Sequence, residues 1–325
     1  MATAGRSGPP PASSPPAPVS RGTIEYVRSI ESVREFSKPR SFLASLLERV
    51  AGPAETPQLV RPYALAEDST GRLIVADTGQ RVVHILDSER RRYRFIRGER
   101  RTPFAAPVGV AVDSADNIYV SDSVRARVYV FNSNGKTLRT IGDPARGVEL
   151  KRPTGLAIDP EQQLLYIADT LRHQILVLNL AGTLVRTIGQ RGNGPGDFNF
   201  PTSLTISGET LFVVDAMNFR VQALTRDGRF LRSFGKLGNR TGTLNRPKGI
   251  AADSDGNLYV VDALFETVQV FDSEGRLLYY FGASGRGPAQ FALPTGIYIG
   301  PRNRIFVADT YNHRVQEFRY RKVGP

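Results

Sequence analysis

One segment recurs six times along this chain of 325 residues, and this repetition constrains the fold more than any other feature. Each copy begins with an apolar segment that starts at Pro and then reaches a second apolar segment that ends in Asp. These aspartates lie 45, 47, 46, 47 and 47 residues apart, at Asp77, Asp122, Asp169, Asp215, Asp262 and Asp309. A third apolar segment follows each Asp, and a fourth usually ends in Gly, as at Gly142 and Gly189. Each copy therefore predicts four short strands.

Turn residues separate the predicted strands within each copy. Residues 68–71 (D-S-T-G) and 253–256 (D-S-D-G) are two examples of such turns. A four-stranded unit of roughly 40–50 residues in tandem is the signature of a β-propeller blade. One blade cannot bury both faces of its sheet, whereas six blades in a ring can, and closing the ring removes most exposed edges. We therefore predict an all-β fold, a six-bladed β-propeller with four-stranded antiparallel blades.

The sixth copy lacks a fourth strand. It starts at Pro294 and stops near Tyr320 after three predicted strands. Residues 22–31 (G-T-I-E-Y-V-R-S-I-E) precede the first copy, and their V-R-S-I matches the fourth-strand pattern of the other copies. We predict that residues 23–31 pair beside the third strand of the sixth blade, Arg314–Phe318, and so close the ring.

The chain divides into three parts by composition. Residues 1–21 are dominated by Pro, Ala, Ser and Gly, which predicts a disordered, extended tether. Residues 22–57 contain the closing strand, a short amphipathic helix predicted over residues 39–52, and a linker, and residues 58–325 form the propeller. The apolar face of the helix is short, so we expect it to pack on the propeller, with a membrane-surface role as the alternative.

The tether also bears on the cellular location. It lacks the apolar segment of a secretory signal. It is either a native disordered tail, or a spacer behind an export signal or lipid anchor that this chain does not carry. We favour the second interpretation, which predicts a bacterial periplasm or cell-envelope location; the alternative is the cytoplasm.

The basic balance of the chain favours anionic partners. Lys and Arg total 43 against 31 Asp and Glu, which gives a formal net charge of +12 and a pI near 10.1. The densest run, residues 87–101, holds seven Arg against three acids. It is either a solvated outer strand or an anion-binding ridge, in which Arg92 and Arg94 alternate with aromatic residues.

Two absences narrow the range of functions. The chain has no Cys, which excludes disulfides, zinc–thiolate sites, iron–sulfur clusters and a thiol nucleophile. It also has no run of about 18 apolar residues, the length that a membrane-spanning helix needs. We therefore predict no membrane span.

Three motifs carry a likeness to a known repeat family. Residues 153–159 (P-T-G-L-A-I-D), 258–262 (L-Y-V-V-D) and 311–316 (Y-N-H-R-V-Q) represent the first, second and third strands, and the linker 189–201 resembles the family's Gly-rich spacer. Over about residues 58–320 the chain resembles the NHL-repeat β-propellers, and as a whole it is similar to bacterial stand-alone members. The departures are Gln174 and Thr267 in place of Arg, Ser203 in place of Gly, and a repeat that is one residue short before Arg81.

The resemblance implies a geometry and a range of functions. It implies that the first strand of each blade lies nearest the axis. It also implies that the loops between blades (d–a loops) and the turns between second and third strands (b–c turns) share one face. Members of the family mostly bind RNA or protein through that face, and a few relatives are enzymes. The fold alone does not choose between these functions.

No set of side chains in the sequence predicts catalysis. The strand-end aspartates stand at the same position in every copy, so we expect them to accept N–H bonds in the following b–c turn and to pair with the Arg five residues on. His84, His173 and His313 lie in one strand and two turns, too far apart to share a zinc ion. We therefore predict no catalytic residues, no metal site and no cofactor, and favour a protein that is not an enzyme.

The remaining candidate site is the surface of d–a loops and b–c turns. Arg and exposed aromatic side chains are typical of protein interaction hot spots and of single-stranded nucleic-acid platforms. The candidate binding residues are Tyr63, Arg81, Arg125, Arg127, Arg172, His173, Asn218, Phe219, Arg220, Lys248, Phe265, Tyr311, His313 and Arg314. Simple pairing with the strand-end Asp is the alternative for Arg81, Arg127, Arg220 and Arg314. Phe219 and Phe265 are the strongest candidates, because a solvated turn does not explain them.

These residues support a non-catalytic binding scaffold, a monomer whose loop surface binds a protein or other polymer. The first alternative is an RNA-binding propeller, which the charge of +12 favours. The second is a metal-dependent lyase or hydrolase that uses the axial channel. The residues expected at the tops of the first strands offer no carboxylate cluster for it: Tyr63, Thr154, Thr202, Lys248 and Thr295.

Overall fold

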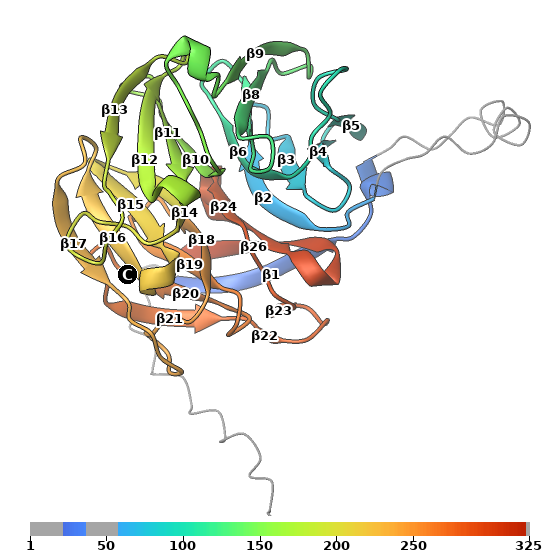
Figure 1. Cartoon of the computed structure of the whole chain (residues 1–325). Helices are drawn as coiled ribbons and strands as arrows, with labels where there is room; N and C mark the ends of the chain where they lie inside the picture. The colour runs from blue at the N-terminus through green and yellow to red at the C-terminus, as the bar shows by residue number, and fades with distance from the viewer. Residues whose placement is uncertain (1–21, 37–57, 323–325) are drawn as a thin grey trace, which may run out of the picture.

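A computed structural model describes residues 22–36 and 58–322 of the chain. Six four-stranded antiparallel sheets stand around a common axis, which confirms the predicted six-bladed propeller (Figure 1). The predicted tether over residues 1–21 and the predicted helix over residues 39–52 lie outside the described residues. Among the described helices, none has the length and apolar character needed to cross a membrane.

Each blade runs from an inner strand at the axis to an outer strand at the rim. From the axis outward, blade 1 has β2 (Pro62–Glu67), β3 (Leu73–Asp77), β4 (Val82–Asp87) and β5 (Arg92–Ile96); blade 2 has β6 (Pro107–Val112), β7 (Ile118–Asp122), β8 (Arg127–Phe131) and β9 (Thr137–Ile141); blade 3 has β10 (Pro153–Asp159), β11 (Leu164–Asp169), β12 (Gln174–Asn179) and β13 (Leu184–Ile188).

The second half of the ring repeats this order. Blade 4 has β14 (Pro201–Ser207), β15 (Thr210–Asp215), β16 (Arg220–Thr225) and β17 (Phe230–Phe234); blade 5 has β18 (Pro247–Ala252), β19 (Leu258–Asp262), β20 (Thr267–Phe271) and β21 (Leu277–Phe281); blade 6 has β24 (Ile297–Gly300), β25 (Arg304–Asp309), β26 (Arg314–Lys322) and β1 (Gly22–Ile30). A short parallel pair, β22 (Ala283–Ser284) and β23 (Gln290–Phe291), lies in the loop between blades 5 and 6. The described 3-10 turns are η1 (Val33–Phe36), η2 (Pro144–Arg146), η3 (Thr170–Arg172), η4 (Ala216–Asn218), η5 (Pro301–Asn303) and η6 (Thr310–Asn312).

The hydrophobic core lies between neighbouring blades. The second and third strands of each blade are runs of β-branched and aromatic residues, and they are almost wholly buried because neighbouring blades cover both faces. One core cluster, for example, joins Ile74 and Val83 of blade 1 to Ile118 and Val120 of blade 2. The ring is therefore held by packing around its whole circumference, and no blade has a complete core of its own.

Glycine in the inner strands lets adjacent blades approach each other at the axis. A Cβ atom added at Gly109 would lie 2.0 Å from the carbonyl oxygen of Thr154 in the inner strand of blade 3. The predicted exception, Ser203, occupies the equivalent position in blade 4. At Gly109 the missing side chain thus permits close backbone packing between blades, while Ala64 and Ser203 fill the same position in blades 1 and 4.

The first described strand closes the ring, as the sequence predicted. β1 pairs antiparallel with β26, with Ile30 opposite Val315 and Ile24 opposite Tyr320. A register shift between Tyr26 and Arg28 turns Val27 outward, where it is 40% exposed. The blade that begins with β24 is thereby completed by the opposite end of the chain.

Side chains reinforce this closure on the face of β1 that carries Arg28 and Ile30. Ile30 is 1% exposed and belongs to a core cluster that includes Leu65 of blade 1 and Phe306 of blade 6. Two residues earlier on the same face, Arg28 donates to the Glu317 carboxylate at 2.8 Å, and Arg304 of β25 donates to that carboxylate at 3.1 Å. Arg304 also donates to Glu67 of blade 1 at 2.7 Å. This network of charged side chains therefore links the closing strand to blade 6 and to blade 1.

Candidate binding face and axial channel

The strand-end aspartates place the d–a loops and the b–c turns on one face, which we call the loop face. All six are 0% exposed. Asp77 accepts N–H bonds from Val60 at 2.7 Å and Arg61 at 3.0 Å in the loop before blade 1, and from Gly79 and Gln80 in its own b–c turn. Each of the other five also accepts at least one N–H from the d–a loop before its blade. The sequence predicted bonds from every b–c turn to its Asp, and Asp77, Asp122 and Asp262 accept them. The carboxylates of Asp169, Asp215 and Asp309 do not cap the turns that follow them, and the sequence missed the bonds to the preceding loop.

Side-chain donors to these aspartates differ between blades. Asp215 accepts from Nε of Arg220 at 2.8 Å and from Nε2 of Gln222 at 3.2 Å. In blade 3 the corresponding positions are Gln174, which pairs with Asp169 through the strand backbone, and Leu176, which has no donor side chain; Nε of Arg172 lies 3.6 Å from the Asp169 carboxylate instead. Burial raises the pKa of Asp169, although the N–H groups of the preceding loop and nearby positive charges oppose that rise. The strand-end aspartates are therefore structural groups, and the donors that stabilise their charge differ from blade to blade.

The predicted arginines of the loop face fall into paired and free groups. Arg220 and Arg314 bind their strand-end Asp, each at 2.8 Å, as the pairing alternative predicted. Arg127 does not, because its guanidinium donates to the backbone carbonyls of Ala126 and Gly142. The other three are placed as follows: Arg125 donates to the carbonyl of Pro103, Arg172 pairs with Glu149, and Arg81 is exposed with no partner among the described residues.

A residue in the left-handed conformation ends every b–c turn. With φ between 53° and 58°, these residues are Arg81, Ala126, His173, Phe219, Glu266 and His313. Several reach the loop before the next blade: Nδ1 of His173 accepts the N–H of Phe200 at 3.1 Å, and His313 bonds to the carbonyl of Val60. Glu266 accepts the N–H of Leu293 at 3.2 Å. The two predicted histidines therefore join neighbouring blades.

The third histidine, His84, is buried inside β4. Its Nδ1 lies 3.0 Å from the hydroxyl of Tyr93, and its Nε2 lies 3.5 Å from the carboxylate of Asp77. In blades 4 and 6 the same position holds a Gln that donates to the strand-end Asp, whereas Nε2 of His84 is buried and makes no hydrogen bond among the described residues. Burial acts to raise the pKa of Asp77, but the nearby His84 and the backbone N–H bonds outweigh it, and the pKa is lowered.

Three of the four predicted Tyr and Phe residues lie in the b–c turns, two half-buried and one exposed. Phe219 is half-buried at its left-handed position. Phe265 is half-buried and lines a shallow cavity of about 190 Å³ beside Arg240. Tyr311 is 50% exposed, and the guanidinium of Arg61 lies 5.6 Å from the centre of its ring.

The b–c turns also display exposed apolar side chains, of which the sequence analysis identified Tyr311 and missed the other four. Two residues after the strand-end Asp, five of the six blades carry a large apolar or aromatic residue. We call these five the apolar ring: Val124 (72% exposed), Leu171 (46%), Met217 (53%), Leu264 (53%) and Tyr311 (50%). Blade 1 has Gly79 at this position. The available signal was an apolar residue at a turn position where Gly or a polar residue is usual.

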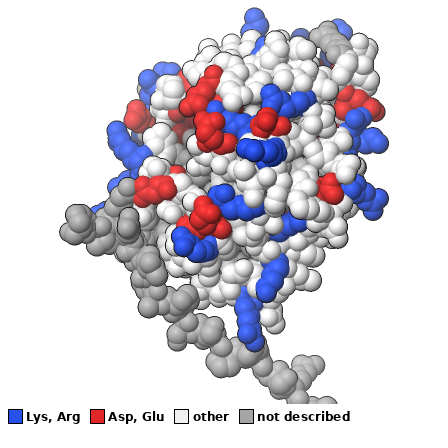
Figure 2. Space-filling model, turned by 90° about the vertical axis from the view of Figure 1, so that its left-hand side faces the viewer, with Lys and Arg blue, Asp and Glu red and all other residues white. Residues whose placement is uncertain are grey.

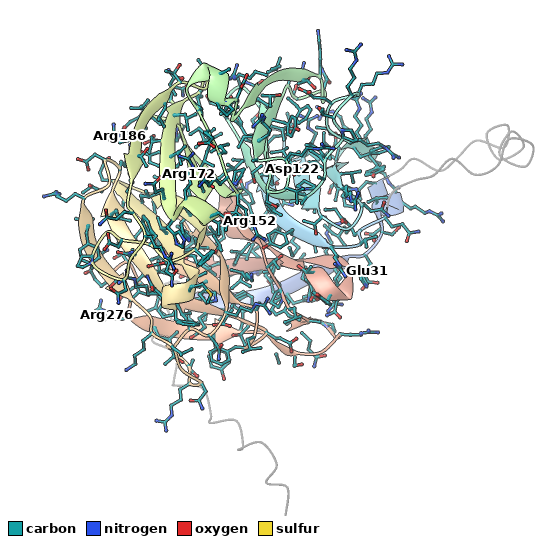
Figure 3. The ribbon with its side chains drawn as sticks, viewed as in Figure 1. Glu31, Asp122, Arg152, Arg172, Arg186 and Arg276 are labelled. Atoms are coloured by element: carbon teal, nitrogen blue, oxygen red, sulfur yellow. The ribbon has the colours of Figure 1, made fainter. Side chains whose placement is uncertain are left out.

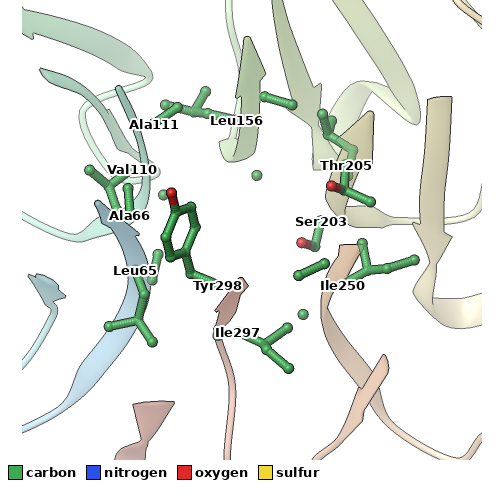
Figure 4. A pocket seen from close by; sticks show the side chains of 18 of the residues that line it. Leu65, Ala66, Val110, Ala111, Leu156, Ser203, Thr205, Ile250, Ile297 and Tyr298 are labelled. Carbon is green, nitrogen blue, oxygen red and sulfur yellow. The ribbon is translucent and has the colours of Figure 1, made fainter. Parts of the chain in front are cut away.

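The inner strands enclose an axial channel with a cavity of about 320 Å³. In Figure 4 the aliphatic side chains of Val110, Leu156 and Ile250 stand around the opening, the ring of Tyr298 projects into it, and the hydroxyl group of Ser203 faces it. Within the described structure, no group of three His, Asp or Glu side chains is arranged to hold a metal ion.

Two predicted residues, Tyr63 and Lys248, line the channel where it opens on the loop face. Burial lowers the pKa of Lys248, and the positive charges of Arg246 and Arg152 lower it further. Burial raises the pKa of Tyr63, which the same two arginines oppose. Arg152 lies near the centre of the ring in Figure 3. The mouth of the channel is therefore positively charged.

The charge of the rim differs from that of the mouth. Figure 2 shows one side of the ring, on which basic and acidic side chains are interspersed. On the outer strand β5, Arg92 and Arg94 are exposed, as alternation along a strand predicts, and Arg94 donates to Asn134 at 3.2 Å. The groove beside them also contains Asp87 and Asp116, which offset part of its positive charge.

Comparisons with known proteins agree on the repeat and on the fold. A family model described as the NHL repeat matches residues 104–131 and 291–318, and a model described as a 6-bladed beta-propeller matches residues 157–232. The comparison with curated proteins found no match.

Several solved structures share the fold. A streptogramin B lyase is 16% identical with a TM-score of 0.61, and the alignment covers 82% of this chain and 96% of the lyase. The virginiamycin B lyase of Staphylococcus aureus is 13% identical with a TM-score of 0.60, covering 92% and 99%. An auxiliary nutrient binding protein of Bacteroides thetaiotaomicron is 14% identical with a TM-score of 0.62, covering 80% and 69%. At these identities the likeness extends to the fold alone.

Proposed function

Because this chain is a six-bladed β-propeller that carries NHL repeats, we propose that it is a non-catalytic binding scaffold whose loop face binds a partner protein. The observation that carries the proposal is the apolar ring. Its five side chains are 46–72% exposed on five successive blades, at one position of the repeat. Single exposed apolar residues are ordinary, but a set repeated around one face is typical of a surface that a partner covers.

The loops that carry the apolar ring are suited to rigid recognition. Every b–c turn is bonded through a buried Asp to a d–a loop, so the ring is fixed before a partner arrives. A preformed surface avoids most of the cost of ordering loops on binding. The predicted residues Tyr311 and Arg81 stand on this face with their side chains exposed, and we place both in the proposed interface.

Two proteins with a similar fold are lyases, so catalysis in the axial channel is the alternative to binding. A lyase or hydrolase site in the channel would need an acid, a base or metal ligands that converge there. Among the described residues that line the channel, the one carboxylate is that of Glu67, and it is bonded to Arg304 at 2.7 Å. This arrangement favours binding over catalysis.

RNA binding is the second candidate, because the net charge is +12 and the channel mouth carries free basic groups. It predicts retention of RNA at low salt, with affinity that falls steeply as salt is added. The monomeric state and the cell-envelope location remain predictions.

The test is site-specific photocrosslinking in the cell from which the chain comes. A photoreactive residue at Leu171 or Leu264 should give one discrete protein adduct, whereas the same residue at Leu184, which is 39% exposed on the outer strand β13, should not. The substitution Met217→Glu should abolish the Leu264 adduct, and Leu231→Glu on the rim should leave it intact. Equal adducts from the loop face and from the outer strand, or no adduct from either, would contradict the proposal. An adduct with a second copy of the chain would contradict the predicted monomer.

A further inference from the structure

Alternate blades place an arginine at the same point of the channel mouth. The residue before the inner-strand Pro is Arg61 in blade 1, Arg152 in blade 3 and Arg246 in blade 5, and it is Ala, Phe or Leu in the other three. The backbone N–H of each arginine is bonded to the buried strand-end Asp of its blade, so all three are held in equivalent positions. Their side chains are exposed, and no described carboxylate pairs with them.

A fourth basic group lies deeper, inside the mouth. Lys248 is the second residue of the inner strand β18, is half-buried, and lines the channel. Tyr63 is the second residue of β2 and lines the same cavity. The charges of Arg152 and Arg246 act on both groups, although the four residues come from three different blades. Arg152 and Arg246 directly precede the inner strands β10 and β18, so both stand at the end of the channel that Lys248 and Tyr63 line.

A bound anion would offset the repulsion among these positive groups. Like charges repel one another, and partial burial removes water that would otherwise solvate the ammonium group of Lys248. The low-dielectric walls of the channel also concentrate the positive potential at its opening. Guanidinium groups match the geometry of carboxylate and phosphate oxygens, and a neutral Tyr hydroxyl can donate to either.

We propose that the mouth of the axial channel is a binding site for a small, multiply charged oxyanion, held by Lys248, Arg152 and Arg246 with the hydroxyl of Tyr63. The cavity of about 320 Å³ is large enough for such a group. The site is distinct from the apolar ring, because none of its four residues belongs to a b–c turn. Phosphate and carboxylate ligands share the required chemistry, so the experiment separates them.

The test is isothermal titration of the full chain at low, matched ionic strength, with inorganic pyrophosphate in one arm and citrate in the other. We expect saturable binding of one anion per chain in at least one arm. Lys248→Gln should weaken that binding roughly tenfold or more, the usual effect of losing a charged hydrogen bond. Lys136→Gln, which removes the same charge from an exposed turn of blade 2, should change it less than about twofold.

The outcomes distinguish a specific anion site from non-specific attraction of anions by the positively charged protein. Binding in one arm alone assigns the site to phosphate or to carboxylate ligands. Equal weakening by both Lys variants, or no saturable binding in either arm, would overturn the proposal. If Lys248→Gln folds poorly, Arg152→Gln, which changes an exposed side chain, can be compared with Lys136→Gln in the same titration. Because crosslinking at the apolar ring does not involve these residues, failure of one proposal leaves the other standing.

Discussion

The closing strand should be a main determinant of stability, and Ile30→Ala tests this. Ile30 is 1% exposed and packs in the cluster that joins blade 6 to blade 1. Truncation of a buried Ile to Ala costs about 2–5 kcal/mol, because it removes apolar contacts and leaves a cavity. In a domain of this size 1 kcal/mol lowers the Tm by about 2 °C, so the expected decrease is roughly 4–10 °C. Val27→Ala is the matched control, because Val27 is on the same strand but 40% exposed.

Thermal and urea unfolding of the two variants, followed by far-UV circular dichroism, measure this difference. Val27→Ala should lower the Tm by less than about 2 °C. Deletion of residues 1–35 removes the whole of β1, one of the two strands that pair with β26, and it should lower the Tm by more than Ile30→Ala does. The reasoning would be refuted if Ile30→Ala and Val27→Ala unfolded at the same temperature, or if the truncated chain kept the Tm of the full chain.

Three further predictions concern the axis and the ring junction. Gly109→Ala should cost about 1–3 kcal/mol by forcing a Cβ against the next blade, whereas Ser203→Ala, where a Cβ already exists, should be neutral in urea unfolding. Glu317→Gln should cost about 1–3 kcal/mol, because Arg28 and Arg304 lose a shared carboxylate. Calorimetry should show a lowered Tm, and an unchanged Tm would contradict the prediction. The pKa of Lys248 is lowered in the folded protein, so the unfolded chain binds more protons between that pKa and 10.5, and wild-type stability should rise with pH across this range. In thermal melts, Lys248→Met should raise the Tm at pH 7.5 and flatten this pH dependence.

The fold could be predicted because the repeat specifies local structure in each copy. Strand-end aspartates, turn residues and apolar runs recur at one spacing, and six copies in register admit few other arrangements. The closing strand could also be predicted, because blade 6 lacks a strand and residues 22–31 supply the missing pattern. The short β22–β23 pair could not, because it depends on how one loop folds between two blades.

The site was less predictable because its contacts join residues that are distant in sequence. The bond between Asp77 and Val60 depends on the path of a loop before the blade, which no local pattern encodes. Phe219 and Phe265 looked exposed because turns are usually solvated, yet both are half-buried. Leu171 and Leu264 were overlooked for the same reason, since a lone apolar residue in a turn carries little information until its equivalents in other blades are compared.

The repeat itself separates structural positions from positions that are available for function. Several of its recurring elements have an intramolecular role: the Asp bonds a d–a loop, the left-handed residue bridges to the next blade in blades 3, 5 and 6, and the first-strand Gly permits close packing. At two positions, the second residue after the Asp and the residue before the inner-strand Pro, most side chains have no such role; the exceptions are Arg61, which packs on Tyr311, and Phe200, which packs on His173. The fold would accept small polar residues at both. Apolar side chains in five blades at the first position, and arginines in alternate blades at the second, therefore call for an explanation outside folding, and binding by the loop face and the channel mouth provides one.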